Sequence, residues 1–374
     1  MKTTHLAIAL VLSLAAAGLM FSQDAAPAPA AAPQKGKGGP PVPPLRPAAM
    51  EKIVVHGKSL EGNLEGDSPD RDVFVYLPLS YTTNRNQRYP VVYFLHGYGA
   101  HAEAYLNLMR VSDTADKNAA TAKSKEMILV FPDAYTIYNG SMYSSSPVTG
   151  DWEAFVTKDL ISYIDSHYRT IPDRDSRGLA GHSMGGYGTL RIGMKYPEVY
   201  SSIYAMSSCC LMNNPGAARG GPPKQAAPPP AAPPADGKAK QGKGRGGFGN
   251  VNFAQAAAWS PNPTNPPQFF DLPTKDGQLV PSVAAKWVAN SPLAMVDQYI
   301  PNLKRYKSIF MDVGLQDGLM AANKELEESM TKLGIVHTYE TYEGDHTNHV
   351  KDRFEQNVLP FFSTNLEFTA KKKK

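Results

Sequence analysis

The sequence has little cysteine, little net charge and few long apolar runs. Its 374 residues include two cysteines, which are adjacent, at Cys209 and Cys210. So few cysteines exclude a fold that is held together by several disulfides. The pair itself leaves two interpretations open, a strained vicinal disulfide or two free thiols.

Motifs for metals and nucleic acids are also absent. The sequence contains no H-E-x-x-H and no paired C-x-x-C, and the spacing of His346 and His349 alone is a weak metal signal. We therefore expect no metal and no other cofactor. The formal net charge of +4 is small for this length, and much of the excess lies in residues 214–250 and in Lys371–Lys374. No nucleic acid is expected as a partner, and no pattern indicates an oligomeric state.

One apolar run lies near the N-terminus, from Leu6 to Leu19, with Ser13 as its polar interruption. Lys2 precedes this run and small residues close it, which is typical of a secretory signal peptide. The run is shorter than the ~20 apolar residues that a membrane-spanning helix needs. We predict a signal peptide at residues 1–22, no stable membrane span after cleavage, and a secreted or periplasmic location. An uncleaved N-terminal anchor is the alternative.

Two segments are rich in Pro, Ala, Gly and Lys, a composition that cannot bury a core. Residues 23–50 are predicted to form a linker and residues 214–250 a disordered insertion. The domain itself is expected over residues 51–366, followed by a basic tail at 367–374. The insertion is either a solvated segment or a weak contact for an acidic surface or polysaccharide.

Between these segments, apolar periodicity alternates between the strand and the helix repeat. Strands are predicted at Asp72–Leu77, Val91–Leu95, Met127–Phe131, Gly178–Ala180, Ile203–Met206, Ile309–Met311 and His337–Tyr342, and helices at residues 152–167, 184–196 and 319–333 and from Val350 past a kink at Pro360. This alternation indicates an α/β fold with a mainly parallel sheet and helices on both faces. In such folds, ligands bind at the carboxyl ends of the strands.

The segment Gly181–Gly186 reads G-H-S-M-G-G and contains the G-x-S-x-G pattern. An apolar run precedes it and a helix-compatible stretch follows it, which is the strand–turn–helix setting of a nucleophilic serine. Such a turn strains the backbone of Ser183. Gly181 and Gly185 are needed because a Cβ at either position would collide with the facing backbone. Ser183 is therefore the predicted nucleophile.

A serine nucleophile needs a base, and the base needs an orienting carboxylate. In this architecture the chain order is serine, acid, histidine. Three histidines follow Ser183. His337 begins a predicted strand and so lies at the wrong end of the sheet. His346 follows that strand and is the predicted base, with His349 as the competitor.

The acid should follow the preceding strand, where Asp312 and Asp317 are the candidates. Asp312 lies at the end of the strand and suits a residue that holds the loop. Asp317 lies beyond Gly314 in the loop, which suits a carboxylate that reaches His346. Asp317 is therefore the predicted acid.

An oxyanion hole needs two N–H donors. One is assigned to Met184, because it directly follows the nucleophile. The second is assigned to Tyr98, in a glycine-rich loop that follows a buried strand, with Gly97 and Gly99 as alternatives.

These residues resemble the secreted esterases of the α/β-hydrolase superfamily. That family includes feruloyl and acetyl-xylan esterases, enterochelin esterases, S-formylglutathione hydrolase and mycolyltransferases. The resembling segments, which span about Glu51–Leu366, are Arg88–Gly97, Asn139–Tyr143, Ser146–Gly150, Gly181–Gly188, Asp312–Asp317 and Glu343–His346. The resemblance implies the α/β-hydrolase fold, with Ser183, Asp317 and His346 as nucleophile, acid and base. It also implies Tyr98 and Met184 as oxyanion donors.

The chain departs from this family in two places. Many relatives carry a tryptophan two residues after the histidine, where this chain has Asn348. The insertion at 214–250 falls where relatives build substrate-recognition loops. Both departures bear on the substrate.

Together these patterns predict an exported serine carboxylesterase that forms an acyl-enzyme on Ser183. Its expected substrate is an ester, with feruloyl or acetyl groups on polysaccharides as the expected class. Tyr143 and Trp152 are expected either to line the substrate pocket or to pack in the core.

Two alternative functions remain. One is an acyltransferase with the same triad, in which a sugar hydroxyl replaces water. The other is a non-catalytic wall-binding protein.

Overall fold

The computed structural model describes residues 50–212 and 251–370. The predicted signal peptide, the insertion at 214–250 and nearly all of the predicted linker lie outside the described residues. The described residues belong to one folding unit, Pro43–Lys374.

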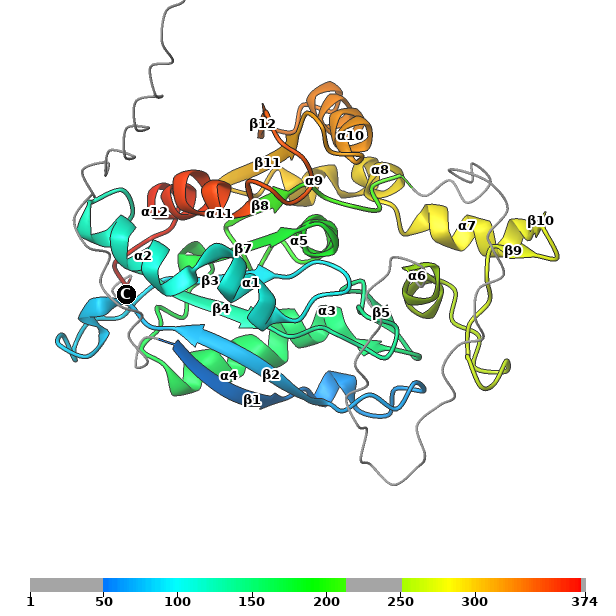
Figure 1. Cartoon of the computed structure of the whole chain (residues 1–374), viewed down its shortest axis with the longest axis horizontal. Helices are drawn as coiled ribbons and strands as arrows, with labels where there is room; N and C mark the ends of the chain where they lie inside the picture. Colours follow the sequence, from blue (N-terminus) through cyan, green and yellow to red (C-terminus); the bar gives the residue numbers. More distant parts are fainter. Residues whose placement is uncertain (1–49, 213–250, 371–374) are drawn as a thin grey trace, which may run out of the picture. The chain divides into compact units, whose positions relative to one another are not determined.

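An eight-stranded sheet forms the centre of this unit (Figure 1). The strands are β1 (Met50–His56), β2 (Asp70–Tyr76), β3 (Val91–Leu95), β4 (Ile128–Pro132), β7 (Arg177–His182), β8 (Ser202–Met206), β11 (Ser308–Gly314) and β12 (Thr338–Tyr342). Their order is β1-β2-β4-β3-β7-β8-β11-β12. β2 pairs antiparallel with β1 and β4, and the other neighbouring pairs are parallel. The predicted α/β fold with a mainly parallel sheet is confirmed.

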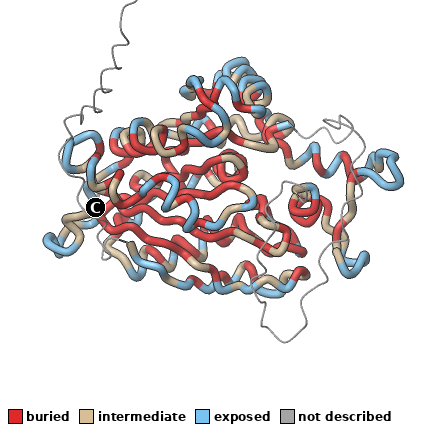
Figure 2. The backbone as a smooth tube through the Cα atoms, viewed as in Figure 1, coloured by how far each residue is buried: buried red, intermediate tan, exposed pale blue. Residues whose placement is uncertain are grey.

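All residues of β3 and β4 are buried, and Figure 2 shows the central strands in red. Along β3, Val91 and Tyr93 belong to one apolar cluster, whereas Val92 and Phe94 belong to the cluster on the other face. Successive side chains of a strand point to opposite faces. A strand covered on both faces therefore needs a continuous apolar run, and this is why the sequence revealed β3 so clearly.

Helices supply the cover on both faces. The helices are α1 (Ala102–Met109), α2 (Val111–Ala120), α3 (Trp152–Ala154), α4 (Leu160–His167), α5 (Met184–Lys195), α6 (Val251–Trp259), α7 (Pro281–Ala289), α8 (Pro292–Met295), α9 (Ile300–Leu303), α10 (Met320–Lys332), α11 (Val350–Arg353) and α12 (Leu359–Asn365). The helices α1, α2, α11 and α12 pack on one face, and α3 to α10 contribute to the cluster on the other face. Two short hairpins, β5 (Ser145–Ser146) with β6 (Gly150–Asp151) and β9 (Thr274–Lys275) with β10 (Gln278–Leu279), lie outside the sheet.

Two helices that were predicted as continuous each contain a π-helical turn. Phe155–Asp159 joins α3 to α4, and Phe354–Val358 joins α11 to α12. In the second turn, the N–H of Leu359 bonds to the carbonyl of Phe354, five residues earlier. Pro360 follows and has no N–H to donate, so the regular pattern breaks next to the predicted kink.

Two predicted boundaries are corrected. Met50 belongs to β1, so the linker can extend no further than residue 49. The predicted tail begins too early, because the N–H of Glu367 donates to the carbonyl of Asp175 (2.9 Å) and Phe368 packs against the apolar cluster. Within the described ranges, no helix is both long and apolar enough to cross a membrane.

Candidate active site

Ser183 lies at the sharp turn between β7 and α5. Its φ of 60° and ψ of −114° are uncommon for a residue with a side chain. Its N–H donates to the carbonyl of Met206 (3.0 Å), and its carbonyl accepts from the N–H groups of Tyr187 (3.0 Å) and Cys209 (3.1 Å). Hydrogen bonds from three segments thus hold the strained residue in place.

The glycines around Ser183 permit close contacts between backbones. A Cβ on Gly181 would lie 2.3 Å from the carbonyl oxygen of Gly185. A Cβ on Gly185 would lie 1.9 Å from the carbonyl oxygen of Leu95. The predicted reason for both glycines, a collision with the facing backbone, is confirmed.

The imidazole of His346 bridges Ser183 and Asp317. Its Nε2 lies 2.9 Å from Oγ of Ser183, and its Nδ1 lies 2.8 Å from Oδ2 of Asp317. The other carboxylate oxygen of Asp317 accepts from the N–H of Leu319 (2.9 Å). Burial acts to raise the pKa of Asp317, but the hydrogen bonds from His346 and Leu319 outweigh it and lower the pKa. The ionised carboxylate can therefore hold a proton on Nδ1, which leaves Nε2 free to accept one from Ser183.

The competing residues have other partners. His349 bonds to Asp352 (2.9 Å), and His337 precedes β12 at the opposite end of the strand from His346. The carboxylate of Asp312 is fully buried and accepts from Arg353 (2.8 Å). Among the candidates, the structure brings together Ser183, Asp317 and His346.

The loops that carry Asp317 and His346 interlock. The N–H of Gln316 donates to the carbonyl of Gly344 (2.9 Å), and its side-chain oxygen accepts from the N–H of Gly344 (2.6 Å). A Cβ on Gly314 would lie 2.2 Å from the carbonyl oxygen of Gly344. Asn348 accepts from the N–H of Asp345 (3.0 Å) and so closes the loop around the histidine.

The two assigned oxyanion donors come from two different segments next to Ser183. Met184 is the first residue of α5, so its N–H is one of the helix-terminal donors without an intrahelical acceptor. The loop that contains Tyr98 runs beside the serine, since a Cβ on Gly97 would lie 3.3 Å from that of Ser183. The N–H of Gly99 donates to the carbonyl of Asn139 (2.9 Å) and is therefore engaged, which leaves Tyr98 and Gly97 as the candidates from this loop.

A buried histidine holds this loop. The Nε2 of His96 accepts from the N–H of Ala134 (2.8 Å), and its Nδ1–H donates to the carbonyl of Gly97 (2.9 Å). Burial lowers the pKa of His96, so the ring stays neutral and can make both bonds. This role of His96 was not predicted from the sequence.

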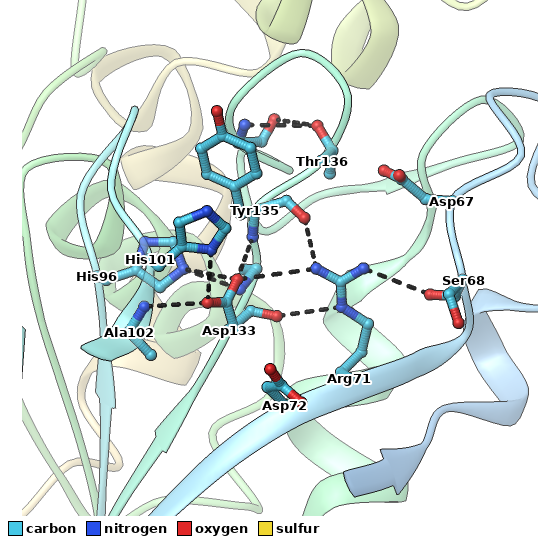
Figure 3. A network of polar contacts seen from close by, with 12 residues as sticks. Asp67, Ser68, Arg71, Asp72, His96, His101, Ala102, Asp133, Tyr135 and Thr136 are labelled. Carbon is cyan, nitrogen blue, oxygen red and sulfur yellow. Dashed lines mark hydrogen bonds and ion pairs between the residues drawn. The ribbon is translucent and has the colours of Figure 1, made fainter. Parts of the chain in front are cut away.

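Asp133 extends the support of the loop, as Figure 3 shows. Its carboxylate accepts from Nδ1 of His101 (2.9 Å) and from the N–H of Ala102 (3.2 Å). The guanidinium of Arg71 donates to the backbone carbonyls of Asp133 (3.2 Å) and Tyr135. These hydrogen bonds connect β2, the end of β4 and the start of α1 next to the loop that carries Tyr98.

A second buried histidine, His182, holds the backbone of the proposed base. His182 donates from Nε2 to the carbonyl of His346 (2.8 Å) and accepts at Nδ1 from the hydroxyl of Tyr105 (2.7 Å). Burial, with the nearby charge of His346, lowers the pKa of His182 to about 3, so this ring is neutral. The position of His182 next to Ser183 is a signal in the sequence, but its two partners are distant and could not be identified there.

Tyr143 and Trp152 pack in the core. Tyr143 is 0% exposed and its hydroxyl donates to the carbonyl of His96 (3.1 Å). Trp152 is 1% exposed and its Nε1 donates to the carbonyl of Thr149 (2.8 Å). Of the two expectations for these residues, packing in the core agrees with the structure and lining of a substrate pocket does not, because neither side chain reaches a surface. Among the described residues, no group of three His, Cys, Asp or Glu side chains is placed to hold a metal ion.

Sequence comparisons point to esterases. A family profile described as "Putative esterase" matches residues 68–357. The chain is 34% identical over 140 residues to an esterase of Mycobacterium tuberculosis. This aligned region covers 36% of this chain and 28% of that protein. It is 31% identical over 159 residues to an endo-1,4-beta-xylanase/feruloyl esterase of Xylanibacter ruminicola. This second aligned region covers 41% of this chain and 22% of that protein. The matched part is thus less than a third of either relative.

Structural comparisons show the fold. A ferulic acid esterase superposes with a TM-score of 0.61 at 21% identity, over 85% of this chain and 98% of the other. An S-formylglutathione hydrolase from Agrobacterium tumefaciens superposes with a TM-score of 0.56 at 16% identity, over 85% of this chain and 95% of the other. The α/β-hydrolase fold implied by the sequence is therefore confirmed.

Proposed function

The chain belongs to this esterase family, and we propose that it is an exported serine carboxylesterase that forms an acyl-enzyme on Ser183. Family membership supports an enzyme that hydrolyses esters. One observation supports the serine mechanism above all others. Two hydrogen bonds connect Oγ of Ser183 through the ring of His346 to the carboxylate of Asp317.

In the first half of the reaction, Oγ of Ser183 attacks the ester carbonyl while Nε2 of His346 takes the hydroxyl proton. Asp317 keeps Nδ1 protonated and stabilises the imidazolium that forms. The carbonyl oxygen becomes negatively charged and accepts hydrogen bonds from the N–H groups of Met184 and Tyr98. The N-terminus of α5 favours this charge as well.

The first half ends when the imidazolium of His346 gives its proton to the departing alcohol oxygen and the C–O bond of the ester breaks. The acyl group remains on Ser183. Water then attacks the acyl carbonyl, with His346 as the base, and the carboxylic acid leaves as the serine hydroxyl is restored.

The proposed substrates are feruloyl or acetyl esters on polysaccharides outside the cell. Two features support this class. The match to a protein named as an endo-1,4-beta-xylanase/feruloyl esterase suggests an ester attached to a plant-wall polysaccharide. The signal-peptide pattern at residues 1–22 suggests export, so we expect the full chain to yield a shortened protein in the periplasm or medium. N-terminal sequencing of the exported protein tests this, and a retained full-length chain would contradict it.

The mechanism is tested with Ser183→Ala and a panel of nitrophenyl esters and methyl ferulate. We expect turnover to fall by about 10⁴-fold or more. Ser166→Ala is the control, because this exposed hydroxyl bonds within its own helix. A fluorophosphonate should label Ser183 in the wild type, as shown by peptide mass spectrometry. Unchanged turnover in Ser183→Ala would contradict the assignment. Adding an alcohol acceptor to the assays distinguishes hydrolysis from acyl transfer.

A further inference from the structure

We propose that Cys209 and Cys210 form a reversible vicinal disulfide that fixes the backbone contact of Ser183. The proposal rests on the proposed function, because Ser183 is the residue whose position the disulfide would control. The pair lies shortly after β8, which ends at Met206, and precedes the insertion at 214–250. The esterase mechanism described above uses neither thiol.

The two thiols are already close. Their sulfur atoms lie 2.7 Å apart and are not bonded. A disulfide bond is about 2.05 Å long, so an approach of less than 1 Å would close it. In an extended strand the two side chains would point to opposite faces. Cys210 instead has a φ of 59°, and this turn of the backbone lets both sulfur atoms lie on the same side.

The pair is connected to the nucleophile through the backbone. The N–H of Cys209 donates to the carbonyl of Ser183 (3.1 Å). The preceding carbonyl, that of Ser208, accepts from the side chain of Asn323 (2.9 Å). A change in the backbone at Cys209 and Cys210 therefore acts directly on one of the bonds that hold Ser183 in its strained conformation.

The surroundings indicate which thiol reacts first. The side-chain amide of Gln255 donates to Sγ of Cys210 (3.3 Å). The hydrogen bond with Cys210 and burial raise the pKa of the Cys209 thiol, which therefore stays protonated longer. Cys210 is thus the attacking thiol and Cys209 the resolving one.

The oxidant is a small disulfide such as glutathione disulfide. The thiolate of Cys210 attacks one of its sulfur atoms, forms a mixed disulfide and releases one glutathione thiolate. Cys209 then loses its proton and attacks Sγ of Cys210, which releases the second glutathione. The two cysteines lose two electrons and two protons, and the glutathione disulfide is reduced to two thiols.

The resulting bond should be easy to reduce. Adjacent Cα atoms are about 3.8 Å apart, whereas disulfides usually join Cα atoms about 4.4–6.8 Å apart. Such a strained bond has a more oxidising potential than an ordinary structural disulfide. Because the thiols already lie close together, we expect oxidation to fix the conformation seen here and reduction to loosen it. The oxidised enzyme should therefore be the more active form.

Alkylation of the full chain tests whether the bond forms. The chain has two cysteines, so any intramolecular disulfide must join them. After treatment with a phosphine reductant, iodoacetamide should add two labels by mass spectrometry. After treatment with glutathione disulfide, it should add none to a chain that migrates as a monomer without reductant. Two labels after oxidation, or a persistent glutathione adduct, would overturn the proposal. This readout does not depend on esterase activity.

Turnover of a nitrophenyl ester tests the link to Ser183. We expect the oxidised form to be faster by at least about threefold, and the difference to reverse with reductant. Cys209→Ser and Cys210→Ser should each lose the response to redox state and match the reduced wild type. Met212→Ala, an exposed substitution in the same segment, should keep the response. Equal turnover of the two forms would overturn the link. A disulfide in a chain without turnover in either form would instead contradict the proposed esterase mechanism.

Discussion

Asp312 and Asp317 lie five positions apart, yet their surroundings give them different roles. Asp317 receives the Nδ1–H of the proposed base, whereas Asp312 receives the guanidinium of Arg353. We predict that Asp317→Asn lowers kcat by about 10⁴-fold, because an amide no longer holds His346 in the required tautomer. Steady-state kinetics on a nitrophenyl ester measures this, and thermal unfolding should change little.

Asp312→Asn is the matched control. It removes the buried partner of Arg353, and breaking a buried ion pair typically costs about 3–5 kcal/mol. Urea unfolding should therefore show a clear loss of stability, while kcat stays within about tenfold of wild type. The opposite pattern, with kcat lost in Asp312→Asn and kept in Asp317→Asn, would assign the acid to Asp312.

His182 makes stability depend on pH in a defined direction. Its pKa is lowered to about 3 in the folded protein, against about 6.5 in an unfolded chain. Between these values the unfolded chain binds a proton that the folded protein does not. Stability is therefore fully present above pH 6.5 and falls as the pH is lowered toward 3, by about 1.4 kcal/mol per pH unit.

We predict that His182→Gln reduces the slope of the free energy of unfolding against pH by the contribution of about one proton, which is about 1.4 kcal/mol per pH unit. The glutamine amide can still donate to the carbonyl of His346, but it does not titrate. The free energy of unfolding in urea, measured from pH 7 to 4, checks the slope. Part of the slope should remain, because burial also lowers the pKa of His96. His167→Gln, on the surface, should keep the wild-type slope. Equal slopes for wild type and His182→Gln would show that His182 is not held neutral.

Among the elements, the sequence revealed those with a continuous apolar run or a strong motif. All residues of β3 are buried, and its predicted bounds match the structure. β1 was missed because it is an edge strand in which Val55 alone is buried. α2 was missed because its sequence, VSDTADKNAA, has little apolar character. A strand before Ser183 and a helix after it were predicted, and this is why the sharp turn at Ser183 could be assigned from the sequence.

The candidate site could be predicted from the sequence only in part. Chain order and position at strand ends suffice to select Ser183, Asp317 and His346 as a set, and the structure places them within hydrogen-bond distance. The supports of this set could not be predicted. His182 and Tyr105 are 77 positions apart, and their contact depends on how α1 packs against the sheet. Long-range contacts of this kind leave no local pattern in a sequence.

The sharp turn between β7 and α5, which carries Ser183, can be tested at Gly185. Gly185→Ala places a Cβ 1.9 Å from the carbonyl oxygen of Leu95, a backbone atom that cannot move aside without shifting β3. We predict that this variant fails to accumulate as folded protein, as judged by circular dichroism and soluble yield. Gly318→Ala is the control, because a Cβ there meets no heavy atom within 4 Å. A folded and active Gly185→Ala enzyme would show that the turn between β7 and α5 can shift to make room for the added Cβ.

At the level of the whole molecule, the insertion at 214–250 interrupts the domain between two packed segments. Before it, Leu211 is fully buried. After it, α6 buries Trp259, whose ring packs edge-on against Trp287. The apolar core is therefore continuous across the described residues on both sides. The insertion itself lies outside the described residues, and its interpretation as a solvated segment stays a prediction.

We predict that replacing residues 214–250 by a Gly/Ser segment of equal length leaves the fold and the chemistry unchanged. The replacement keeps the length of the connection and removes the basic side chains, so it isolates the effect of composition. The free energy of unfolding should change by no more than about 0.5 kcal/mol, as for surface substitutions. Turnover of nitrophenyl acetate and the salt concentration that elutes the protein from an acidic polysaccharide column should match wild type. Earlier elution of the variant would instead assign the insertion to adhesion, since exposed charge contacts weaken with salt. A loss of stability would show that the segment packs against the domain.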